Sequence, residues 1–256
     1  MKNIGYYKKW GNSKKIILTF LAGWVRINNQ SKTKERDLPM KLFNYDSGIM
    51  RSLSKFTDCI CLSLLFFVSC IPIVTIGAAL TALYYTAHKV LRHDRGYLFR
   101  DYIASFRDNF KQVTPVWVVA AVIGGVLGID LYVVNYNIKA GGLFQALSML
   151  FLVGSAVWFA WVSYLFPYMA RFENTRKQSM KNAILMVVAH LPMTILMLVV
   201  AVVIILLLCI APFLIFILPA VHAWIQSYIL ERIFRKYMTE EDREAEDAKY
   251  KEDAMQ

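Results

Sequence analysis

Charged residues are scarce through the middle of this chain. Between about residues 58 and 234 they collect in short basic gaps that separate long apolar runs, such as 115–129, 143–170 and 183–210. Runs of this kind approach or exceed the roughly 20 residues that a helix needs to cross about 30 Å of hydrocarbon. With 57% hydrophobic and 18% charged residues, the chain does not have the composition of a soluble domain. The sequence predicts an all-α fold, a polytopic helical membrane bundle.

Motifs for catalysis and for cofactor binding are also missing. The sequence contains no nucleotide-binding loop, HExxH pair, GxSxG elbow or EF-hand spacing. Cys59 and Cys61 would lie on different faces of a helix, so their spacing does not predict a metal pair. We therefore expect no enzymatic activity, no cofactor and no metal site.

The net charge of +11 raises the question of a nucleic-acid partner. Neither zinc-finger spacing nor a basic stripe with interleaved stacking aromatics accompanies that charge, so we expect no nucleic-acid binding. An excess of Lys and Arg is typical of the cytoplasmic loops of membrane proteins. The lipid bilayer is the expected partner.

The distribution of charge among the loops predicts the number of spans. Ala87–Gln112 carries six basic residues against three acids, and Arg171–Asn182 carries four against one. A single span over 56–91 would give five spans and would place both basic loops outside the cell. A break at Pro72–Gly77 gives six spans, and it keeps these loops and both termini in the cytoplasm. The predicted spans are 52–71, 76–93, 113–136, 143–170, 183–208 and 213–234, with five spans as the alternative.

The two ends of the chain differ from the membrane domain, which we place at residues 42–236. Residues 1–41 form a basic N-terminal extension, and residues 237–256 form a charged tail. The apolar run Ile16–Val25 is too short to span a bilayer. It is either an interfacial helix or sequence upstream of an internal start at Met40.

Polar groups within the apolar segments are costly and often functional. The candidate intramembrane polar site consists of His190, Gln226, His222 and Asp130. Pro192 leaves the carbonyl four residues before it without a donor, and Gln226 lies closer to the expected depth of His190 than His222 does. This patch could bind a hydroxyl group or relay a proton. Alternatively, His190 is a buried histidine bonded to a neighbouring helix, and Asp130 is an interfacial acid that accepts hydrogen bonds near Thr75.

The segment Tyr97–Phe110 has the apolar spacing of an amphipathic cytoplasmic helix. Its candidate partner-binding residues are Phe99, Arg100, Ile103, Phe106, Arg107 and Phe110. This helix either rests on the inner leaflet or the base of the domain, or it docks a cytoplasmic protein. Its mixed charges suit a protein better than anionic lipid, which favours nearly pure Lys and Arg.

Several segments resemble a known family. They are Phe43-Asn44-Tyr45-Asp46, Cys70–Ala78 with Thr81–Tyr85, Gly96-Tyr97, Phe106–Gln112, Phe166-Pro167 and His190-Leu191-Pro192. Together these segments resemble the YesL family of bacterial integral membrane proteins, over about residues 42–236. The resemblance implies a multi-pass protein of the bacterial cell membrane in a setting of carbohydrate uptake, and it implies no catalytic residues.

From this resemblance we expect a non-enzymatic accessory or permease-like component of carbohydrate uptake, whose partner is a sugar ABC importer permease or ATPase. The alternative is a small independent transporter or channel. The ligand and the oligomeric state stay open.

Overall fold

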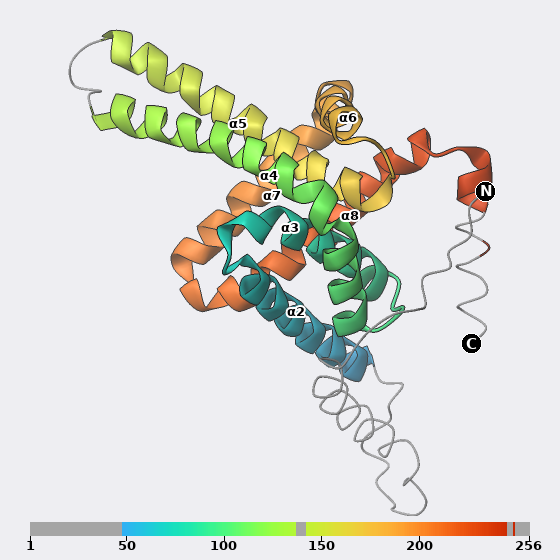
Figure 1. Ribbon diagram of the computed structural model, residues 1–256. Helices are drawn as coiled ribbons and strands as arrows, with labels where there is room; N and C mark the ends of the chain where they lie inside the picture. Colours follow the sequence, from blue (N-terminus) through green and yellow to red (C-terminus); the bar gives the residue numbers. More distant parts are fainter. Residues whose placement is uncertain (1–47, 137–141, 245–247, 249–256) are drawn as a thin grey trace, which may run out of the picture. The chain divides into compact units, whose positions relative to one another are not determined.

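The computed structural model describes residues 48–136, 142–244 and 248, and this part of the chain is helical and contains no strand (Figure 1). The N-terminal extension and most of the charged tail lie outside it. The elements are α2 (Gly48–Cys70), η1 (Ile73–Thr75), α3 (Ile76–Thr86), the π-helical segment η2 (Ala87–Arg92), α4 (Leu98–Tyr136), α5 (Gly142–Arg171), α6 (Arg176–Ala189), α7 (Leu191–Ile210), η4 (Pro212–Phe216) and α8 (Leu218–Tyr237). The all-α prediction is confirmed.

Four helices of the described part are long and apolar enough to cross a membrane. They are Ser52–Cys70 within α2, and the whole of α4, α5 and α7. The predicted span 76–93 corresponds to α3 and η2, and the predicted span 213–234 corresponds to η4 and α8. These two are shorter or more polar than the other four, so the count of six spans stays a prediction.

Two predicted boundaries are wrong. The predicted span 183–208 is divided at His190, where α6 ends and α7 begins, because Pro192 cannot donate a backbone hydrogen bond to the preceding turn. The predicted cytoplasmic helix 97–110 and the predicted span 113–136 are one continuous helix, α4, of 39 residues. At 1.5 Å per residue α4 is about 58 Å long, so it extends well beyond a hydrocarbon core.

Helix α3 is enclosed by protein rather than by lipid. Its residues Gly77, Ala78, Ala79, Thr81, Ala82, Leu83, Tyr84 and Thr86 are all buried. A Cβ atom at Gly77 would lie 2.5 Å from Cβ of Trp117 on α4, so the missing side chain allows α3 and α4 to pack closely. Small residues therefore make α3 a central packing element, whereas the sequence predicts only that it belongs to the weakest of the six spans, 76–93.

Helices α4 and α5 lie side by side (Figure 1). Trp158 of α5 donates from Nε1 to the carbonyl of Ala120 on α4 at 3.0 Å, and its ring covers Gly124. Gly125 and Gly128 have nothing within 4 Å of the position of a Cβ atom. Gly124 therefore serves packing within the chain.

The six-span topology predicts which side of the membrane each loop faces. In a background without native cysteines, Cys at Asp108 or Gln178, both exposed in the structure, should resist an impermeant thiol reagent in intact cells. Cys at Gly142, which is also exposed, should react. Lysed cells control for reactivity at all three positions. Labelling of Asp108→Cys and Gln178→Cys from outside would instead support five spans.

Candidate functional site

The predicted patch of His190, Gln226 and His222 is not formed. His190 lies at the break between α6 and α7, and its ring packs edge-on against Tyr237 with 5.7 Å between ring centroids. Tyr237 is the last residue of α8. Along that helix it lies about 16 Å from Gln226 and about 22 Å from His222. His190 is therefore at a different depth from the two residues it was expected to join.

Asp130 does not have the expected environment near Thr75. The hydroxyl of Thr75 donates to the carbonyls of Ser69 and Pro72 at 2.5 and 2.6 Å. Within the described residues Asp130 has no hydrogen bond or ion pair. Asp130 is half-buried on α4 and makes no contact of either kind with the other three candidates.

Gln226 instead completes the backbone of α5. It is buried on α8, and its Nε2 donates to the carbonyl of Ser163 at 2.7 Å. Pro167 lies inside α5, four residues after Ser163, and proline has no N–H to donate to that carbonyl. Gln226 therefore supplies the hydrogen bond that Pro167 removes.

The same arrangement occurs at the second proline within a helix. Pro115 lies inside α4, and the carbonyl four residues before it belongs to Lys111. Arg176, the first residue of α6, donates from Nη2 to this carbonyl at 2.9 Å. A side chain of a later helix thus satisfies the carbonyl at each proline, which matters because unpaired backbone groups are costly in or near lipid.

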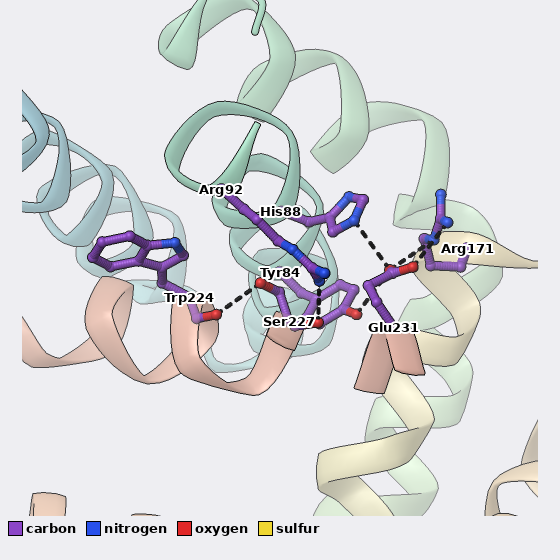
Figure 2. Close-up of polar contacts among 7 residues, drawn as sticks. All are labelled: Tyr84, His88, Arg92, Arg171, Trp224, Ser227 and Glu231. Atoms are coloured by element: carbon purple, nitrogen blue, oxygen red, sulfur yellow. Dashed lines mark hydrogen bonds and ion pairs between the residues drawn. The ribbon is translucent and has the colours of Figure 1, made fainter. Parts of the chain in front are cut away.

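The most concentrated polar group in the described residues surrounds Glu231 on α8. We define the Glu231 cluster as Tyr84, His88, Arg171 and Glu231. The first two come from α3 and η2, and Arg171 ends α5. Figure 2 shows Tyr84, His88 and Arg171 pointing toward the carboxylate of Glu231. Tyr84, His88 and Glu231 are 1%, 5% and 4% exposed, so the cluster is a buried site that joins four helical elements.

The contacts of the Glu231 carboxylate satisfy both of its oxygens. Arg171 Nε lies 2.9 Å from Oε1, and Arg171 Nη2 donates to Oε2 at 3.0 Å. Tyr84 donates its hydroxyl to Oε1 at 3.1 Å, and His88 Nε2 lies 3.4 Å from the same oxygen. The Nη2 contact is a charge-assisted hydrogen bond, and the Nε contact is an ion pair. The charge of Glu231 is therefore balanced within the protein.

The π-helical segment η2 carries a second link to α8. Arg92 Nη1 donates to the carbonyl of Ser227 at 2.6 Å, and its guanidinium lies 4.6 Å from the centroid of the Tyr228 ring (Figure 2 shows the first contact). Ser227 donates its hydroxyl to the carbonyl of Trp224 at 2.7 Å. Helix α8 is thus held to α3 and η2 on one side and to α5 on the other.

Sequence reasoning did not identify this cluster. One signal was available: Glu231 is the only acid in the segment 213–234, and such residues within or beside spans usually have partners. The spacing of Tyr84 and His88, four residues apart on one helix face, was a second signal. The partner of Glu231, Arg171, gives no such signal, because in the sequence it is one of four basic residues in the loop Arg171–Asn182.

A cleft of about 1250 Å³ lies beside the cluster, and Arg171 lines it. The first half of α4 forms one wall, while the end of α5, the following loop and the start of α6 form the other. Charges of both signs line the two walls: Asp101, Asp108, Lys111, Arg171, Glu173, Arg176 and Lys177. Lys89 pairs with Asp101 at 2.9 Å. The cleft is open and its lining mixes charged and apolar side chains, unlike the predominantly apolar pockets that take small molecules.

The candidate partner helix is the first part of α4, and its residues divide between two faces. Phe99 and Ile103 are 40% and 46% exposed, and Arg100 and Arg107 are also exposed. Phe106 and Phe110 are half-buried, and Tyr102 beside them is 1% exposed. Tyr102, Phe106 and Phe110 therefore anchor the helix to its own domain. The outward face keeps the two apolar side chains of Phe99 and Ile103 and the two basic side chains of Arg100 and Arg107.

No group of three or more His, Cys, Asp or Glu side chains within the described ranges could hold a metal ion.

Comparison with known proteins gives a partial family match. Residues 59–131 match a family described as "Protein of unknown function, DUF624". This region runs from α2 into the second half of α4, so it contains Tyr84 and His88 but not Arg171 or Glu231. No curated protein and no solved structure matches the chain. The match supports an integral membrane protein when taken with the four apolar helices.

Proposed function

We propose that this chain is a non-enzymatic accessory or permease-like component of carbohydrate uptake in a bacterial cell membrane. The first part of α4 would bind a cytoplasmic protein, either a sugar ABC importer permease or its ATPase. The carbohydrate setting rests on the resemblance to the YesL family. The protein-binding role is supported by one observation, the outward face of α4.

That face combines exposure with rigidity. Phe99 and Ile103 are exposed one turn apart, and Arg100 lies beside them. On the opposite face Leu98 and Tyr102 are buried, so binding a partner would not require the helix to become ordered. Aromatic and Arg side chains are the usual energetic anchors of protein interfaces.

Charge reversal tests this proposal. Replacing Arg100 and Arg107 with Glu should lower recovery of a co-purifying cytoplasmic protein at least tenfold. Each introduced Glu would repel the acidic groups of the partner with which the Arg side chain paired. Recovery is measured after purification of the full chain in mild detergent. Membrane insertion should be unchanged, because both side chains are exposed.

The matched control is the pair Lys177→Glu and Lys181→Glu, two exposed basic residues of α6. This variant changes the net charge equally and should retain the partner. Equal loss in both variants would show a general effect of charge and would contradict the proposal. Failure of the wild-type protein to retain any cytoplasmic protein would contradict it too.

A second candidate function is an independent transporter or channel. The observation that favours it is the Glu231 cluster, a buried charged group next to an open cleft that shares Arg171. Flux of a labelled sugar into liposomes that contain only the purified protein would support this function. Flux that appears only with an added ATPase and permease would support the accessory role.

A further inference from the structure

Helix α6 carries an exposed stripe that changes character along its length. Lys177 and Lys181 lie one turn apart on the exposed face. Ile184, Leu185 and Val188 continue the same stripe and are 51%, 55% and 63% exposed. The opposite face packs into the protein through its buried residues, Ser179, Ala183, Met186 and Val187. The stripe therefore belongs to a helix that is fixed in place and faces outward.

The stripe ends next to a possible membrane span. Lys177 and Val188 are eleven residues apart, which is about 16 Å along the helix. Helix α7, one of the four possible spans, begins immediately after α6. The apolar end of α6 thus adjoins a helix that is long and apolar enough to span a membrane, and its basic end lies farther from that helix.

The charge of α6 points to an anionic partner. The helix contains Arg176, Lys177 and Lys181 and no acid, and the nearest acid before it in the sequence, Glu173, lies in the preceding loop. The first part of α4 differs, because Asp101 and Asp108 lie on the same helix as its arginines and line the cleft. Nearly pure basic charge next to an apolar surface suits anionic lipid, whereas mixed charge suits protein.

We infer that the stripe of Lys177, Lys181, Ile184, Leu185 and Val188 binds an anionic phospholipid. The two ammonium groups contact the headgroup phosphate, and the acyl chains run along the three apolar side chains. Arg176 has a separate role, because its guanidinium donates to the carbonyl of Lys111. This inference is independent of the partner proposed for α4.

Lipid titration of the full chain tests the inference. The protein in detergent is titrated with phosphatidylglycerol or phosphatidylcholine, and bound lipid is counted by native mass spectrometry. The wild-type protein should prefer phosphatidylglycerol. Because each basic residue near the surface contributes about a fivefold change in affinity, Lys177→Gln with Lys181→Gln should reduce this preference roughly 25-fold.

The matched control removes two charges from α4, through Arg100→Gln and Arg107→Gln, and should keep the preference. A thermal melt establishes that each variant is folded, and Lys177→Arg with Lys181→Arg should keep the preference as well. An unchanged preference in the Lys177→Gln and Lys181→Gln variant would overturn the inference. Equal loss in the α4 variant would also overturn it, since the effect would then be that of net charge alone.

Discussion

Glu231→Gln should lower the free energy of unfolding by about 3–5 kcal/mol, the range for removing one partner of a buried ion pair. The substitution leaves the guanidinium of Arg171 next to a neutral amide. Its two contacts with Glu231, at 2.9 and 3.0 Å, lose their opposite charge, and the position is 4% exposed. For a chain of this size the melting temperature in detergent should fall by roughly 10 °C.

Two further variants identify the cause of that loss. Glu173→Gln removes an exposed acid two residues after Arg171 and should leave the melting temperature within about 1–2 °C. Glu231→Gln combined with Arg171→Met removes the unpaired charge and should be more stable than Glu231→Gln alone. If Glu231→Gln melts at the same temperature as Glu173→Gln, the cluster does not hold α5 and α8 together.

Gln226→Leu should destabilise the protein by about 1–3 kcal/mol, because it leaves a buried carbonyl without a donor. That carbonyl belongs to Ser163 of α5, and Gln226 Nε2 is 2.7 Å from it. This carbonyl needs a donor from a side chain because Pro167, four residues later, has no backbone N–H. The loss can be measured as a shift in the thermal or denaturant midpoint of the purified protein.

A double-mutant cycle with Pro167→Ala separates this account from simple loss of packing. Alanine restores an N–H that can bond to Ser163 within α5, so Pro167→Ala should recover most of the stability lost in Gln226→Leu. In the wild-type background the same change should have a smaller effect, because Gln226 already occupies the carbonyl. An equal effect of Pro167→Ala in both backgrounds would mean that the two sites are independent.

The sequence predicts the all-α class and three of the six span positions well, because both depend on apolar length alone. The predicted spans 52–71, 113–136 and 143–170 lie within or nearly within α2, α4 and α5. Prediction failed where tertiary contacts decide the outcome. The burial of α3 depends on close packing at Gly77 against Trp117, and hydropathy does not distinguish a helix enclosed by protein from one that faces lipid.

The candidate site shows the same limit. Sequence reasoning placed Gln226 in a polar patch with His190 and the carbonyl that Pro192 leaves without a donor. It chose Pro192 and His190 as the companions of Gln226, whereas the structure pairs Gln226 with Pro167 and Ser163. The depth of a residue in the membrane, calculated along its own helix, does not show which other helices are its neighbours. Arg171 and Glu231, 60 positions apart, were missed for the same reason.

The two carbonyls at Pro115 and Pro167 also bear on how the protein is made. Their donors, Arg176 and Gln226, lie later in the chain than the helices that they complete. A chain is synthesised from its N-terminus, so α4 is complete before Arg176 is added and α5 is complete before Gln226 is added. Each of these two carbonyls therefore obtains its side-chain donor only after a later part of the chain has been made and has packed against the helix.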